Sequence, residues 1–74
     1  MGRLVRLDRS GHTTVAEWTP QDPATAERAA SLFADQLARG MIASADRTGG
    51  VAEVVRELPL DAELVVLRRP IAGG

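Results

Sequence analysis

The first eighteen residues alternate between short apolar runs and a polar turn. Three apolar side chains mark a first strand: Leu4, Val5 and Leu7. The segment Arg9–His12 then predicts a turn, because Gly11 adopts positive φ angles without steric cost. The residues that follow, HTTVAEW, are rich in β-forming types and alternate in polarity. Together these segments predict an N-terminal β-hairpin.

Simple alternation assigns the two faces of the second strand. It predicts one face made of Thr14, Ala16 and Trp18, and an opposite face made of Thr13, Val15 and Glu17. The size of the Trp18 side chain indicates that its face is the buried one. We therefore expect Trp18 in the core or at its edge, against the element that follows.

A helix is the clearest element of the pattern. Asp22 suits an N-cap, Pro23 suits the first helical position, and Gly40 suits the C-terminal end. Apolar residues recur at helical spacing, at Ala26, Ala30, Phe33 and Leu37, flanked by Ala29 and Ala34. The expected polar side carries Glu27, Arg28, Asp35, Gln36 and Arg39. We assign the apolar stripe to the core.

The middle of the chain permits two interpretations. Residues 41–45 predict a strand, and the segment DRTGG predicts a turn. Residues 51–58 have apolar side chains at helical spacing, yet most of these are β-branched, and Gly49-Gly50 suits a hairpin turn better than a helix start. We favour a second hairpin over a short helix for this segment.

The last strand is the strongest in the sequence. Pro59 ends the preceding segment, PLDA predicts a turn, and Leu64–Leu67 form a continuous apolar run that is typical of a central strand. The order is then strand, strand, helix, strand, strand, strand. This order predicts an α+β fold in which the last strand lies parallel to the first at the centre of the sheet.

Composition restricts the classes of function. The chain has 74 residues, no cysteine, a formal net charge of -1 and a sequence pI of about 5.7. It therefore predicts one small domain without disulfides, thiolate chemistry or a zinc site. No apolar run reaches the length of a membrane span, and the start has no signal core. We expect a soluble, cytoplasmic protein with neither a membrane nor a nucleic-acid partner.

Few side chains suggest catalysis. His12 lies in or beside a turn, and no carboxylate is evidently placed to orient it. Asp8, Asp46 and Asp61 fall near separate turns without calcium-loop spacing, and Gly49-Gly50 lacks the Lys-Ser/Thr of a phosphate loop. We predict no catalytic residue, no bound metal and no enzyme activity.

The C-terminal residues are the candidate site. Pro70 cannot donate to a strand ladder, so we expect the last strand to leave the sheet there. The four residues beyond it reach on the order of 13 Å when extended. Gly73 and Gly74 have no Cβ and offer an unhindered carboxylate for a partner's narrow channel. A partner enzyme that uses ATP would adenylate this carboxylate, after which a sulfur donor, thiol or amine attacks.

The segment DAELVVLRRPIAGG resembles the ends of the sulfur-carrier proteins of molybdopterin and thiamine biosynthesis. The first forty residues resemble ubiquitin and its relatives in layout, with a hairpin followed by a capped helix that ends at Gly40. The resemblance implies a β-grasp fold, with a domain over 1–70 and a projecting tail over 71–74. It also implies activation at Gly73 and Gly74 by an adenylating enzyme. The neighbouring residues implied in partner docking are Arg68, Arg69, Pro70, Ile71 and Ala72.

The resemblance leaves several alternatives open. A sulfur carrier would serve a cofactor-biosynthesis synthase, whereas a protein modifier would be joined to target proteins. All nine basic residues are Arg; the absence of Lys fits either genome composition or a carrier that avoids conjugating itself. A non-catalytic structural or interaction subunit of a larger assembly is the alternative function. A regulator or nucleic-acid binder has only the Arg68-Arg69 pair in its favour, and the acidic pI opposes it.

Overall fold

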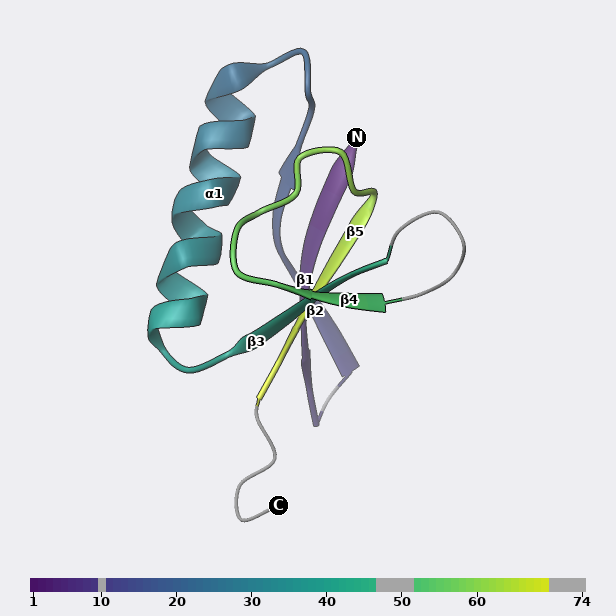
Figure 1. Ribbon diagram of the computed structural model, residues 1–74, viewed down its shortest axis with the longest axis vertical. Coiled ribbons are helices and arrows are strands. Elements are labelled where there is room, and N and C mark those ends of the chain that lie inside the picture. The colour runs from purple at the N-terminus through teal and green to yellow at the C-terminus, as the bar shows by residue number, and fades with distance from the viewer. Residues whose placement is uncertain (10, 47–51, 70–74) are drawn as a thin grey trace.

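The fold has the element order that the sequence predicts. The computed structural model describes residues 1–9, 11–46 and 52–69. These residues form one helix and five strands: β1 (Gly2–Asp8), β2 (Gly11–Trp18), α1 (Pro23–Ala38), β3 (Ile42–Asp46), β4 (Ala52–Val55) and β5 (Leu64–Arg68) (Figure 1). The predicted turn between β3 and β4 falls mostly on residues 47–51, outside the described residues.

The five strands form one mixed sheet with the order β2-β1-β5-β3-β4. β5 pairs in parallel with β1 and antiparallel with β3, while the β1–β2 and β3–β4 pairs are antiparallel. The prediction of a central last strand parallel to the first is therefore confirmed. β4 pairs with β3 over Ala52–Val55, so the hairpin interpretation of this segment is confirmed and the helical alternative is wrong.

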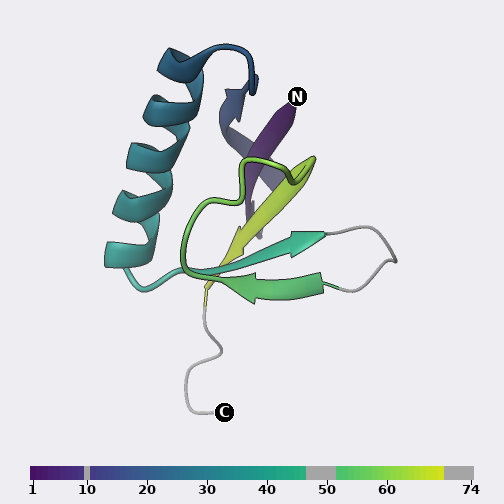
Figure 2. The same ribbon diagram turned by 45° about the horizontal axis from the view of Figure 1, so that its top comes forward.

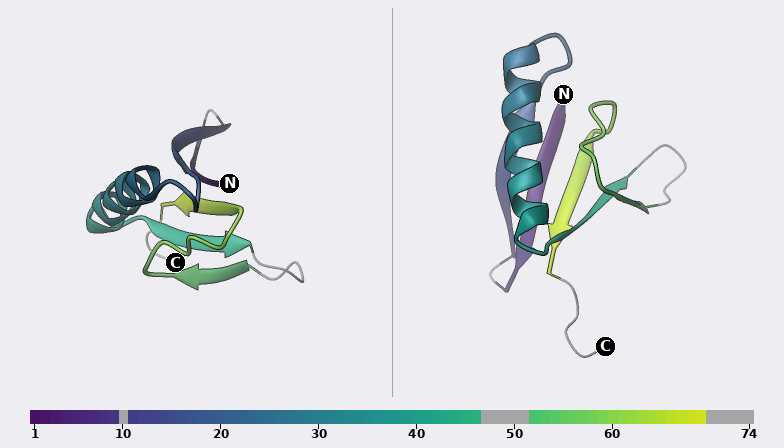
Figure 3. Two further views of the ribbon diagram at one scale, coloured as in Figure 1. Left: turned by 90° about the horizontal axis from the view of Figure 1, so that it is seen from above. Right: turned by 60° about the vertical axis from the view of Figure 1, so that its left-hand side comes forward.

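α1 lies across one face of the sheet (Figures 2 and 3). Its start follows the prediction: Asp22 is the N-cap and accepts a hydrogen bond at Oδ1 from the backbone N–H of Ala24, with a separation of 3.1 Å. Pro23 occupies the first helical position, where no N–H is needed. The core between helix and sheet consists of Leu4, Trp18, Ala29, Phe33, Ala43, Ala45, Ala62, Val65 and Leu67.

The buried stripe of α1 is rotated from the predicted one. The buried residues of the helix are Ala29, Phe33 and Gln36, whereas Ala30 and Ala34 are exposed. Positions three and four apart share a helix face, so a stripe centred on Ala29 and Phe33 includes Gln36. The assignments of Ala30 and Ala34 to the core and of Gln36 to the polar side were therefore wrong. Tertiary packing, rather than side-chain polarity, sets the orientation of this helix.

The faces of β2 also differ from simple alternation. The pairing shifts by one residue between Leu4, which pairs with Ala16, and Val5, which pairs with Thr14. Val15 is the extra residue of this irregularity, and it packs against the core. Ala16 and Trp18 lie on the helix-facing side as predicted. The predictions that Thr14 shares that side and that Val15 opposes it were wrong, because an inserted residue reverses the alternation.

Trp18 is the largest of the fully buried side chains, with 1% of its surface exposed. Its Nε1–H donates a hydrogen bond to the backbone carbonyl of Leu60 at 3.1 Å, which links the first hairpin to the loop before β5. Gly2, opposite Trp18 in the β1–β2 register, leaves room for the ring. A Cβ atom at Gly2 would overlap indole atoms Cε2, Cζ2 and Nε1. The prediction that Trp18 belongs to the core is confirmed.

Within the described ranges, no helix combines the length and the apolar character needed to cross a bilayer. The 16-residue helix α1 has three charged side chains, Glu27, Arg28 and Asp35, and all three are exposed. The helix therefore has a face suited to water and a face suited to the sheet.

The contact between Gly2 and Trp18 gives a first prediction. Gly2→Ala is expected to lower the free energy of unfolding by about 1–3 kcal/mol, because the added methyl group overpacks the indole site. Chemical denaturation followed by circular dichroism measures this loss. In a Trp18→Phe background the smaller ring gives the methyl group room, so the same substitution should cost less, with a coupling of about 0.5–3 kcal/mol. An equal cost in both backgrounds would mean that the indole is not the obstacle.

The N-cap of α1 gives a second prediction. Asp22→Ala is expected to cost about 1 kcal/mol of stability, because the N–H of Ala24 loses its side-chain acceptor. Asp35→Ala is the matched control. It removes an exposed carboxylate from the same helix, together with an ion pair worth less than about 0.5 kcal/mol. Urea denaturation measures the free energy of unfolding of both variants. Equal decreases for Asp22→Ala and Asp35→Ala would show that the N-cap hydrogen bond does not stabilise the helix.

Candidate functional site

The described residues end at Arg69, just before the predicted tail. β5 ends at Arg68, and Arg69 follows it with an exposed side chain. The predicted exit point Pro70, the docking residues Ile71 and Ala72, and the activation residues Gly73 and Gly74 lie outside the described residues. The structure therefore places the base of the tail, and the prediction for the tail itself remains a prediction.

Arg68 and Arg69 occupy different surroundings. Arg68 pairs with Ile42 at the end of the β3–β5 ladder, and its exposed side chain follows Val66 on the sheet face opposite to α1. Arg69 lines a pocket on the side of the helix. The two arginines therefore belong to two different surfaces. The surface that carries Arg69 contains a pocket.

The pocket forms where three elements end together. β1, α1 and β5 run in the same general direction and finish at the same end of the molecule (Figures 1 and 3). The pocket has a volume of about 520 Å³. Its described lining residues are Arg6, Leu7, Asp8, Gln36, Arg39, Gly40, Met41 and Arg69. Residues from both halves of the sequence thus meet at one site.

The end of α1 fixes one wall of this pocket. Arg39 is the C-cap, and Gly40 follows it with a φ of 92°, which favours glycine. The N–H of Gly40 donates to the carbonyl of Leu37 at 2.9 Å, and the N–H of Met41 donates to the carbonyl of Gln36 at 3.2 Å. This pair of bonds is a Schellman motif. The sequence predicts Gly40 as the C-cap; the cap is Arg39, and Gly40 is the next residue, where the positive φ falls.

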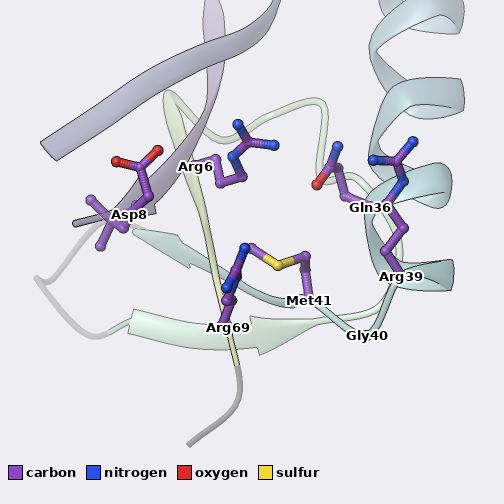
Figure 4. A pocket seen from close by; sticks show the side chains of 8 residues that line it. Arg6, Asp8, Gln36, Arg39, Gly40, Met41 and Arg69 are labelled. Carbon is purple, nitrogen blue, oxygen red and sulfur yellow. The ribbon is translucent and has the colours of Figure 1, made fainter. Parts of the chain in front are cut away.

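Gln36 is the buried polar residue of the described chain, with 8% of its surface exposed. Its side chain has no hydrogen-bond partner among the described residues. Every fully buried side-chain N or O atom of these residues does have a partner, so the polar atoms of Gln36 are not fully enclosed. The carboxamide therefore reaches the pocket. In Figure 4 the side chains of Gln36 and Arg6 face each other across the hollow, from α1 and β1.

The pocket is rich in positive charge. Arg6 pairs in register with Leu67, a core residue, so its half-buried side chain lies on the helix-facing side of the sheet. Arg39 makes an exposed ion pair with Asp35, with 3.5 Å between Nη2 and Oδ2. No ion pair with a residue that the structure describes neutralises Arg6 or Arg69. Asp8 supplies a carboxylate at the rim.

The other candidate residues stay apart. His12 is exposed in β2, beside the turn of the first hairpin. Asp8, Asp46 and Asp61 do not come together: the described residues contain no group of three or more His, Cys, Asp or Glu side chains placed to hold a metal ion.

The pocket leaves no motif in the sequence because its charged residues come from three distant segments. Arg6, Arg39 and Arg69 are each typical solvent-exposed positions in the linear pattern. One signal was available. Gln36 follows Phe33 by three residues, so any helix that buries Phe33 brings Gln36 toward the same face. A polar residue inside a buried stripe indicates a site rather than a core position.

Comparison with known proteins adds no relative to this description. No family model, curated protein or solved structure matches the chain.

Proposed function

We propose that this chain is a β-grasp, ubiquitin-like protein that a partner adenylating enzyme activates at the carboxylate of Gly74. In this proposal residues 1–70 form the domain and 71–74 form a projecting tail. The observation that carries the proposal is the sheet order β2-β1-β5-β3-β4, with the last strand central and parallel to the first. A hairpin, a helix across the sheet and a second hairpin complete this arrangement.

The central position of β5 supports a working tail. Val65 and Leu67 are completely buried, and β5 has a hydrogen-bonded neighbour on each side. The strand that precedes the tail is therefore among the best-held segments of the molecule. A partner that binds residues beyond Arg69 would find them attached to a stable central strand. The tail could then enter the partner's active site without unfolding of the domain.

The proposed chemistry belongs to the partner. A carboxylate oxygen of Gly74 attacks the α-phosphorus of ATP, pyrophosphate leaves, and an acyl adenylate forms. A sulfur or amine nucleophile then attacks the carbonyl carbon of Gly74, and AMP leaves with the bonding electron pair. Gly73 and Gly74 contribute a slim backbone without Cβ atoms, and the chain binds no cofactor of its own. Arg68 and Arg69 are the described residues that lie next to this tail.

The product distinguishes two versions of the proposal. Sulfur transfer to the carbonyl makes the chain a sulfur carrier for a cofactor-biosynthesis synthase. Amine attack makes it a protein modifier joined to target proteins. The closing segment resembles that of sulfur carriers, and the hairpin and helix resemble ubiquitin in layout, so both versions are retained.

An interaction subunit of a larger assembly is the second candidate, and the open face of the sheet favours it. Leu64 and Val66 are only partly buried on the face opposite to α1, and Val54 of the edge strand β4 is 65% exposed. Apolar side chains on an uncovered face are typical of binding surfaces. In this role the tail would be incidental.

Intact-mass spectrometry of the protein from its native host tests both candidates. We expect a fraction in which sulfur replaces one carboxylate oxygen of Gly74, or a fraction joined to other proteins. Deletion of Gly74 should abolish either product. Gly74→Ala keeps the carboxylate but adds a Cβ, and it should reduce the product because the methyl group narrows the approach to the carbonyl.

Two outcomes would contradict the proposal. One is a mature C-terminus other than Gly74. The other is a single unmodified mass together with a Gly74 deletion that supports normal growth of the host. The second outcome would favour the interaction subunit.

A further inference from the structure

We propose that the pocket between the ends of β1, α1 and β5 binds a phosphate group, carried by a small organic phosphate. The side chains that bind it are Arg6, Gln36, Arg39 and Arg69. This site goes beyond the proposed activation of the tail and does not depend on it, because none of its residues lies beyond Arg69.

Charge is the first argument. Arg6, Arg39 and Arg69 bring three positive charges to the pocket, and Asp8 brings one negative charge, so the described lining has a formal charge of +2. Asp35 lies outside the lining and pairs with Arg39, which lowers this sum to +1. A phosphate monoester carries about -1.5 to -2 charges near neutral pH. The net positive charge that remains, most of it on Arg6 and Arg69, therefore favours an anion such as phosphate.

The supply of donors is the second argument. Guanidinium groups donate in a planar fork that matches phosphate and carboxylate oxygens. Here the groups come from three separate elements, and Gln36 adds a carboxamide from the helix face. The two oxygens of a planar carboxylate accept enough hydrogen bonds from one or two guanidinium groups. The three terminal oxygens of a phosphate monoester accept hydrogen bonds from several directions. The arrangement therefore favours phosphate.

The burial of Gln36 and Arg6 is the third argument. Gln36 is 8% exposed and has no partner within the described chain, and Arg6 is half-buried without an ion pair there. No fully buried side-chain N or O atom of the described residues lacks a partner, so the donors of Gln36 and Arg6 open onto the pocket. The carbonyls of Gln36 and Leu37 already accept bonds from Met41 and Gly40. A bound oxyanion would supply the missing acceptors.

The remaining lining residues indicate the rest of the ligand. Leu7 and Met41 place apolar side chains beside the charged groups, as Figure 4 shows for Met41. The volume of 520 Å³ exceeds that of a phosphate ion and lies within the range of small-molecule sites. A phosphate joined to a small apolar group should therefore bind more tightly than inorganic phosphate.

A second hollow provides an internal comparison. It has a volume of about 360 Å³, and its described lining includes Arg3, Glu17 and Glu63. Met1 also lines this hollow, so the charges of Arg3 and of the Met1 α-amino group are balanced by Glu17 and Glu63, and no net positive charge favours an anion there. Arg3 lies on the same strand as Arg6, so Arg3→Gln makes the same change of charge at a site that should not bind phosphate.

Titration of the full chain, followed by two-dimensional amide NMR at constant ionic strength, tests the proposal. The probes are phenyl phosphate, inorganic phosphate and acetate. We expect saturable shifts at the amides of Gln36, Gly40 and Met41 with both phosphates, tighter binding of phenyl phosphate, and no saturation with acetate. Arg6→Gln and Arg69→Gln should each weaken binding about tenfold, since each removes a charge-assisted pair. Arg3→Gln should leave it unchanged.

Three results would overturn the proposal. They are a lack of saturable shifts with either phosphate, equal weakening by Arg3→Gln and Arg69→Gln, and binding of acetate as tight as that of phenyl phosphate. Arg69 is exposed and follows the last strand, so its variant should fold even if Arg6→Gln does not. If the protein from its host carries the Gly74 product but binds no phosphate, the phosphate site alone is contradicted. If the protein binds phosphate but never carries the Gly74 product, the tail function alone is contradicted.

Discussion

The fit of the Trp18 ring over Gly2 is the contact on which the arrangement of this small core depends. The indole fills space that a Cβ on its cross-strand neighbour would occupy, and its N–H binds the carbonyl of Leu60 in the loop before β5. Much of the remaining core is made of small side chains: Ala29, Ala43, Ala45 and Ala62. One large ring therefore supplies much of the contact area, and alanines let the helix and sheet approach it closely.

Local signals were enough to predict the elements and their order. The Asp22-Pro23 start, the Gly40 end and the apolar run at Leu64–Leu67 each follow from backbone chemistry that acts over a few residues. Side-chain orientation was harder to predict. The extra residue Val15 reverses the faces of β2, and the core turns α1 so that Gln36 is buried. The first error arises because alternating polarity does not reveal an extra residue in a hairpin strand. The second arises because the packing of the core, rather than the polarity of the helix, sets its orientation.

The two candidate sites differ in how far sequence could reveal them. The tail could be proposed from the sequence alone, because two glycines after a proline and a strong predicted strand form one continuous stretch. The pocket was not evident, since Arg6, Arg39 and Arg69 acquire a common surface only when β1, α1 and β5 end at the same level. A site assembled from chain ends of separate elements leaves no spacing motif to recognise. Its physical sign was a polar residue within a buried helix stripe.

The central position of β5 also has a consequence for biosynthesis. The sheet order places β1–β2 on one side of β5 and β3–β4 on the other, and the two hairpins share no strand pairing. A two-stranded hairpin is marginal by itself in water. During translation, the domain therefore has no complete sheet until β5 has left the ribosome, because its first-made strand must wait for its last-made one. Both hairpins are therefore expected to stay exposed as partly formed units until β5 has been synthesised and can join them.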